Sequence, residues 1–70
     1  MITLSHAKRI GDNLGVNWNR VNIKEFQMGM NEEAEHRDVT HGNLRKTGKI
    51  VLAHLKEHRD YYTRLRKAMR

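Results

Sequence analysis

The chain of 70 residues contains no cysteine and no proline. The absence of cysteine excludes disulfides and thiolate metal sites, which often stabilise very small cores. The absence of proline means that no residue forces a helix to end. Aromatic residues are scarce too, with one tryptophan, one phenylalanine and two tyrosines. We therefore predict a single domain over residues 1–70 with a marginally stable core, which homodimerisation would complete.

Long apolar runs are also missing. No stretch is apolar enough to cross a bilayer, and the first residues lack the apolar segment of a signal peptide. A glycine-rich phosphate loop is missing as well, because Thr47-Gly48-Lys49 has neither the upstream glycine nor the preceding strand of a P-loop. We expect a cytoplasmic protein with no membrane partner.

Positive charge is abundant but unevenly distributed along the chain. The net charge is +6, yet residues 1–43 carry five basic and six acidic side chains, whereas residues 44–70 carry nine basic and two acidic ones. A one-sided basic surface attracts polyanions such as nucleic acid or an acidic protein face. The alternative is a solvated face that keeps a small protein soluble. Charge alone does not choose between these interpretations.

The last third of the chain has the clearest helical pattern. Its apolar positions recur in steps of four and three residues, which places them on one helical face: Val51, Leu55, His58, Tyr62, Leu65 and Met69. Together with the other periodic segments, this pattern predicts an all-α fold, a small bundle of three or four helices. The expected helices span about residues 4–14, 23–37, 44–58 and 60–69, and the last two are either continuous or separated near Arg59.

Capping residues mark several helix ends. Thr3 is a predicted N-cap, and Gly15 suits the position that follows a helix ending at Leu14. Asn22, with Glu25 three residues later, is typical of a capping box, in which each side chain bonds the backbone N–H of the other residue.

Two helix boundaries stay open in the sequence. Asn43 is a candidate N-cap for the third helix, although Thr47 and Gly48 could also start it. Asp60 is a candidate N-cap for a separate last helix, although the periodicity favours a continuous one. Gly29 lies inside the second helix and costs about 1 kcal/mol relative to alanine, which is explained if another helix approaches closely there.

The predicted core combines the inward stripes of the helices with Trp18. Trp18 is interpreted either as a core side chain that closes the gap between helices or as an exposed anchor for a partner. Tyr62 is expected to face inward, and Tyr61 outward among basic side chains. The predicted core residues are Leu4, Ile10, Leu14, Trp18, Ile23, Phe26, Met30, Val51, Leu55, Tyr62 and Leu65.

Five short motifs follow one another along the chain: Phe26-Gln-Met-Gly-Met30, Glu35-His36, Thr47-Gly-Lys-Ile50, Leu52-Ala-His-Leu-Lys-Glu57 and Asp60-Tyr-Tyr-Thr-Arg-Leu65. In this order, the chain resembles a family of small helical bacterial and phage proteins, a domain of unknown function. The resemblance implies a compact helical domain and no particular activity. It also implies a shared pattern that includes His36, His54, Glu57, Asp60 and Tyr61.

The chain departs from this family at two places. Similar members usually have proline where Arg59 stands, and proline would end the helix before Asp60. They also tend to finish in an acidic tail, whereas residues 64–70 are strongly basic here. The basic charge is therefore interpreted as particular to this protein.

The leading hypothesis is a non-enzymatic module that binds a polyanion through its basic C-terminal helix. Lysine and arginine side chains would contact the phosphates of nucleic acid, or an acidic protein surface, with strong salt dependence. A tyrosine among them would stack on bases, although a tyrosine packed on arginine side chains is commoner. No helix-turn-helix, zinc-finger or RNA-recognition signature is present, so binding would be weakly selective. The candidate residues are Lys56, Arg59, Tyr61, Arg64, Arg66, Lys67 and Arg70.

The rival hypothesis is a divalent metal, such as zinc, held between the second and third helices. In helical-bundle carboxylate sites, each of two facing helices supplies a glutamate and a histidine about one turn apart. The alternative is ordinary surface ion pairs, which contribute little. The candidate ligands are Glu32, Glu33, His36, His54 and Glu57.

Two other interpretations are weaker. His54, Glu57 and His58 match the H-x-x-E-H pattern of zinc peptidases, but so short a chain leaves little room for a substrate cleft. No catalytic residue is therefore predicted. A structural subunit that dimerises through its apolar stripe is the third functional hypothesis.

Overall fold

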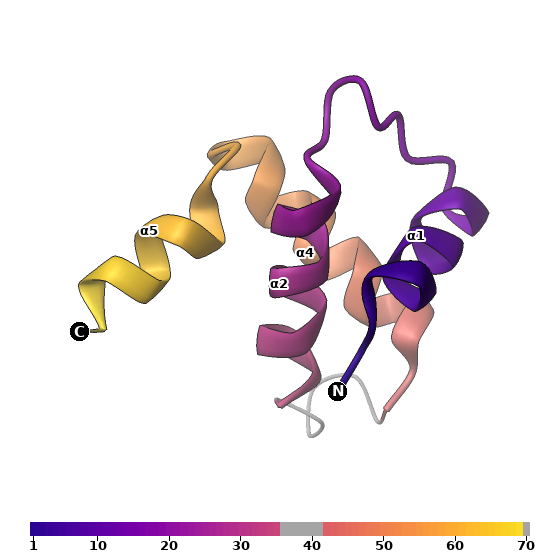
Figure 1. Ribbon diagram of the computed structural model, residues 1–70, viewed down its shortest axis with the longest axis horizontal. Coiled ribbons are helices and arrows are strands. Elements are labelled where there is room, and N and C mark those ends of the chain that lie inside the picture. Colours follow the sequence, from indigo (N-terminus) through magenta and orange to yellow (C-terminus); the bar gives the residue numbers. More distant parts are fainter. Residues whose placement is uncertain (36–41, 70) are drawn as a thin grey trace.

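The computed structural model describes residues 1–35 and 42–69, and these ranges contain four α-helices and no strand. The helices are α1 (Leu4–Asn13), α2 (Ile23–Ala34), α4 (Leu44–Glu57) and α5 (Tyr61–Ala68). Helices α1, α2 and α4 lie together, whereas α5 leads away from them (Figure 1). The predicted all-α fold is confirmed.

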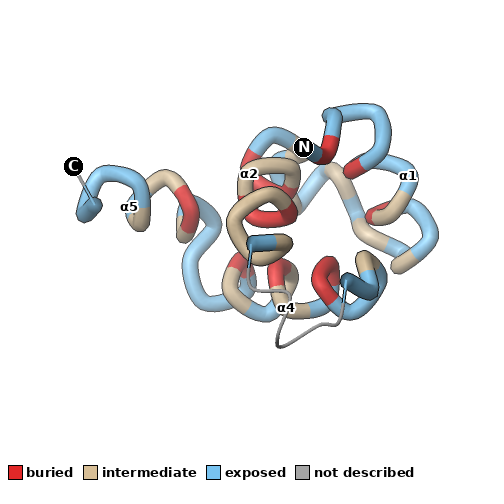
Figure 2. The backbone as a smooth tube through the Cα atoms, turned by 90° about the horizontal axis from the view of Figure 1, so that it is seen from below, coloured by how far each residue is buried: buried red, intermediate tan, exposed pale blue. Residues whose placement is uncertain are grey.

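The core lies where α2 meets α4 and the first turn of α5. Phe26 and Met30 of α2, Val51 of α4 and Tyr62 of α5 are each at most 1% exposed. Along α5 the buried part of the chain is confined to its beginning (Figure 2). Helix α5 is therefore attached to the other helices at one end.

The N-terminal segment differs from the predicted core. Leu4 is 40% exposed, while Ile2 and Ala7, which were not predicted, are buried. Asn31 explains this, because its side chain accepts a hydrogen bond from the N–H of Ile2 at 2.7 Å and donates one to the C=O of Ile2 at 3.0 Å. These bonds hold the segment on α2, with Ile2 in the core and Leu4 outside it. Five other predicted core residues are only half-buried: Ile10, Leu14, Trp18, Ile23 and Leu65.

The ends of α1 agree with the capping signals. The N–H of His6 donates to the side chain of Thr3 at 3.1 Å. At the other end, the N–H of Gly15 donates to the C=O of Asp12 at 3.1 Å, and the next N–H donates to the C=O of Gly11 at 2.9 Å. This pair of bonds is the Schellman motif, and its left-handed position is filled by Gly15 with a φ of 77°.

The start of α4 is decided by Asn43. Its side-chain oxygen accepts from the N–H groups of Arg45 and Lys46 at 3.0 and 3.1 Å. The helix therefore begins at Leu44, and the alternative start at Thr47 is wrong.

Helix α2 is shorter than predicted. It ends at Ala34, and Glu35 is its C-cap, whereas the expected end at residue 37 lies outside the described residues. Three carboxylates, those of Glu32, Glu33 and Glu35, lie in or next to its last turn. They oppose the helix macrodipole, which disfavours a longer helix.

The continuous last helix favoured by the periodicity is wrong. Helix α4 ends at Glu57, and His58 adopts an extended backbone with φ of −144° and ψ of 124°. Because the helix breaks there, the apolar stripe does not continue across the junction. His58 is exposed, and Met69 at the far end of α5 is 62% exposed.

Glu25 explains how α5 begins without a proline before it. Its Oε1 accepts from the N–H groups of Tyr62 and Thr63 at 2.8 and 2.9 Å, and its Oε2 accepts from the hydroxyl of Thr63 at 2.7 Å. The predicted cap Asp60 makes no side-chain capping bond. A carboxylate at this position satisfies two N–H groups that lack partners within the helix and complements the positive end of its dipole.

The predicted capping box of α2 is therefore half correct. Asn22 accepts from the N–H groups of Lys24 and Glu25 at 2.9 and 3.1 Å, as a cap should. The side chain of Glu25 does not complete the box, because it is bonded to α5 instead. Glu25, whose predicted role was confined to the first turn of α2, thus makes a tertiary contact with α5.

Gly29 allows side chains of α4 and α5 to approach α2 closely, in agreement with its predicted role. A Cβ atom on Gly29 would lie 2.6 Å from Cγ1 of Val51 and would also collide with the ring of Tyr62. Neither neighbour can move easily, because both side chains are buried. Glycine disfavours the helix at this position, but its lack of a side chain allows close packing.

Replacement of Glu25 by alanine should destabilise the fold strongly. The variant leaves the first amides of α5 without partners, so the free energy of unfolding should fall by about 2–4 kcal/mol. Urea denaturation followed by circular dichroism measures this loss. Glu57→Ala is the matched control, since the Glu57 side chain is exposed and forms no ion pair within the described ranges. Equal effects of the two substitutions would contradict the assigned role of Glu25.

Gly29→Ala should also destabilise the protein, although alanine is the better helix former. The clash with Tyr62 and Val51 should cost about 1–3 kcal/mol and outweigh the gain of about 1 kcal/mol in helix propensity. Thermal or urea unfolding measures the sign. The exposed position Ala53 provides the control, because Ala53→Gly reports propensity alone. A more stable Gly29→Ala variant would show that the helices do not pack closely at this point.

Candidate functional site

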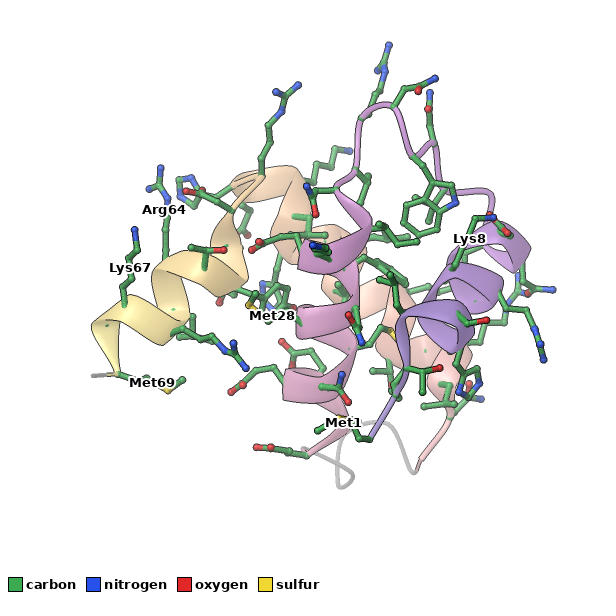
Figure 3. The ribbon with its side chains drawn as sticks, viewed as in Figure 1. Met1, Lys8, Met28, Arg64, Lys67 and Met69 are labelled. Carbon is green, nitrogen blue, oxygen red and sulfur yellow. The ribbon has the colours of Figure 1, made fainter. Side chains whose placement is uncertain are left out.

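Four exposed cationic side chains form what we call the basic surface: Lys56, Arg59, Arg64 and Lys67. Arg64 and Lys67 are one helical turn apart and point to the same side of α5 (Figure 3). Met69 lies on the other side of this helix (Figure 3). The exposed part of α5 therefore has a cationic side that does not face the core.

The remaining members of the basic surface lie where α4 ends. Lys56 and Arg59 line a groove of about 510 Å³ together with Arg20 from the segment between α1 and α2. That segment and the end of α4 lie at the same end of the molecule, the top in Figure 1. Arg64 and Lys67 point toward this end as well (Figure 3). The fold thus collects positive charge from two distant parts of the sequence.

Few carboxylates neutralise the basic surface. Arg64 forms an ion pair with Asp60 at 2.8 Å, and both side chains are more than half exposed. Such exposed pairs contribute little and exchange readily with other partners. Among the described residues, no ion pair involves Lys56, Arg59 or Lys67.

The other predicted members of the polyanion site lie elsewhere. Arg66 lines a hollow together with Glu32 and Glu35, so it faces an acidic part of α2. Tyr61 does not point freely outward as expected, because it is half-buried and stacks on His54 with ring centroids 4.4 Å apart. Arg70 is outside the described residues.

Two of the predicted metal ligands do come together between α2 and α4. Nε2 of His54 lies 3.6 Å from Oε2 of Glu33. Glu57 is exposed at the end of α4, and His36 is outside the described residues. In residues 1–35 and 42–69, no group of three histidine, aspartate or glutamate side chains is placed to hold a metal ion. The metal site stays a prediction, since His36 is not part of this test.

Glu33 already has a partner in the core. Its Oε2 accepts a hydrogen bond from the hydroxyl of Tyr62 at 2.9 Å. Burial raises the pKa of the Tyr62 hydroxyl well above its ordinary value, and the hydrogen bond to Glu33 raises it further. The closeness of Glu33 and His54 is therefore explained by the packing of both side chains around Tyr62.

Trp18 combines the two interpretations that the sequence left open. Its indole packs edge-on against Phe26 with ring centroids 5.5 Å apart, and its Nε1–H donates to Asp12 at 2.7 Å. This bond, together with one from Lys8, lowers the pKa of the Asp12 carboxyl. Yet Trp18 is only half-buried and lines the groove beside Arg20, so part of it faces outward.

Sequence reasoning missed Arg20 as a site residue. It lies in an irregular segment far from the basic C-terminal third, and only tertiary structure places it beside Lys56 and Arg59. Its neighbour Trp18 was the one available signal, as a candidate anchor for a partner.

A family model described as "Protein of unknown function (DUF5661)" covers residues 7–69. The chain belongs to this DUF5661 family. No curated protein and no solved structure matches it significantly. Membership agrees with the resemblance noted in the sequence, and it brings no known activity with it.

None of the described helices of this DUF5661 protein is both long enough and apolar enough to cross a bilayer.

Replacement of Tyr62 by phenylalanine should change the response of stability to alkaline pH. Because the folded-state pKa of Tyr62 is raised above its ordinary value of 10.0, its contribution is complete below that pH and is lost as the pH rises further. Tyr62→Phe should therefore be less stable than the wild type near neutral pH, and the difference should shrink above pH 10.0. Urea unfolding of both proteins at several pH values measures it. A difference that grows with pH would contradict the raised pKa.

Proposed function

We propose that this DUF5661 protein is a non-enzymatic module that binds nucleic acid through the basic surface. The observation that supports the proposal is the exposure of Lys56, Arg59, Arg64 and Lys67. The first two line one groove, and the last two point to the same side of α5 (Figure 3). Only one of these four side chains has a carboxylate partner among the described residues, and that pair is exposed. The proposal keeps the expectation of a cytoplasmic protein, where nucleic acid is accessible.

Binding would depend mainly on electrostatics. Each cation that neutralises a phosphate releases condensed counterions, so affinity falls steeply as salt rises. The basic surface has four cationic side chains, so the slope of log affinity against log salt should correspond to roughly four phosphate contacts or fewer. Arg66 is not expected to contribute equally, because it faces the carboxylates of Glu32 and Glu35.

An acidic protein is the main alternative partner for the same surface. Its recognition would need carboxylates matched in position to particular arginine and lysine side chains. Nucleic acid has a regular line of charge and needs no such match. The long, exposed side chains of Lys56, Arg59 and Lys67 suit the second case better, because no ion pair with a carboxylate holds them in fixed positions among the described residues.

Arg59→Ala should weaken nucleic-acid binding and its salt dependence. Loss of one phosphate contact should reduce the slope of log affinity against log salt by about 1. Fluorescence anisotropy of a labelled oligonucleotide between about 50 mM and about 200 mM salt measures both quantities. Arg9→Ala is the matched control, because Arg9 is equally charged and exposed but lines a different hollow.

Two results would contradict the proposal. The first is that neither single-stranded nor duplex oligonucleotides bind at the lower salt concentration. The second is that Arg9→Ala and Arg59→Ala reduce the slope equally, since binding would then follow net charge and not the basic surface. An acidic protein recovered by pull-down, in the absence of any oligonucleotide binding, would identify the alternative partner.

A further inference from the structure

The groove beside the basic surface has two different walls. One wall is the segment between α1 and α2, which contributes Trp18, Arg20 and Val21. The other is the last part of α4, which contributes Leu52 and Lys56. The volume of about 510 Å³ lies within the range of roughly 300–1,000 Å³ that is usual for small-molecule sites. The groove is therefore large enough to hold part of a ligand and not only solvent.

The chemistry of the groove is that of an anionic ligand with a flat apolar part. Trp18, Val21 and Leu52 supply aromatic and aliphatic surface. Arg20, Lys56 and Arg59 supply three positive charges, and no acidic residue lines the groove among the described residues. Asn19 adds an amide group that can hydrogen-bond, and Asn22, whose Oδ1 caps α2, can still donate through its Nδ2. Charge complementarity thus calls for a ligand whose negative charge lies at the rim of an apolar body.

We propose that this groove receives an unpaired nucleobase, with the flanking phosphates held by Arg20, Lys56 and Arg59. A base supplies a flat face for Trp18 and the aliphatic side chains, and polar edges for the asparagine amides. Each base also carries phosphates on both sides, which matches cations contributed by both walls. The inference rests on the proposed function, and it adds that single strands are the preferred substrate class.

Preference for a single strand follows from the cost of freeing a base. A base in a duplex must be unpaired and unstacked before it can enter the groove, which costs a few kcal/mol. The free energy needed to free a base in a single strand is much smaller. The basic surface alone does not distinguish these two forms, because it contacts only the backbone. The groove is the part of the molecule that would provide the distinction.

The sole tryptophan makes the inference directly testable. Trp18 fluorescence should be followed while the full chain is titrated with a single-stranded oligonucleotide, an abasic strand of equal length and a duplex of equal length. The single strand should change the Trp18 signal and bind at least about fivefold more tightly than the abasic strand, the contribution of about one stacked base. The abasic strand and the duplex should bind through the basic surface without changing the Trp18 signal.

A charge-reversal variant provides a second test. Arg20→Glu should reduce single-strand affinity at least about fivefold more than Arg9→Glu does, because only Arg20 lines the groove. Arg20 lies in an exposed segment, and circular dichroism checks that both variants keep their helices.

The possible outcomes separate the two proposals. Equal binding of single and abasic strands, without a change in Trp18 fluorescence, would overturn the groove assignment and leave the proposed function standing. The absence of binding to any of the three would overturn the proposed function itself. Displacement of the single strand by an acidic peptide that changes Trp18 fluorescence more strongly would assign the groove to a peptide and overturn the nucleobase assignment.

Discussion

The bond between the carboxylate of Glu25 and the first amides of α5 is the interaction on which the arrangement of this protein depends. Tyr62 and Thr63 donate their N–H groups to Glu25 at 2.8 and 2.9 Å. Helix α5 has only Tyr62 fully buried, so apolar packing alone attaches it weakly. The carboxylate of α2 fixes the start of α5 and thereby the direction in which its basic side points.

This attachment links the core to the candidate interface. The ring of Tyr62 packs at Gly29, where a side chain on α2 would collide with it. The turn that contains the buried Tyr62 leads directly to Arg64 and Lys67, which point to the same side of α5 (Figure 3). A short helix thus contributes to stability at one end and presents charge along the rest of its length.

The sequence predicted the fold class because its signals were local. Helical periodicity, the caps Thr3 and Asn43, and the left-handed Gly15 each depend on a few neighbouring residues, and the structure confirms them. Prediction from the sequence failed where a contact between distant residues overrode the local preference. The Glu25 side chain bonds α5 and not the start of its own helix, and the extended backbone of His58 ends α4 although the helical spacing of apolar residues continues past it. The groove was not predictable either, because Arg20 and Arg59 meet only in three dimensions.

Amide hydrogen exchange at Tyr62 and Thr63 tests the central claim most directly. These residues occupy the first turn of a helix, where N–H groups ordinarily lack intrahelical partners and exchange quickly. Because Glu25 accepts from both, they should instead be protected to a degree comparable with the amides in the middle of α4. Exchange as fast as that at the exposed end of α5 would show that Glu25 does not hold this helix in place.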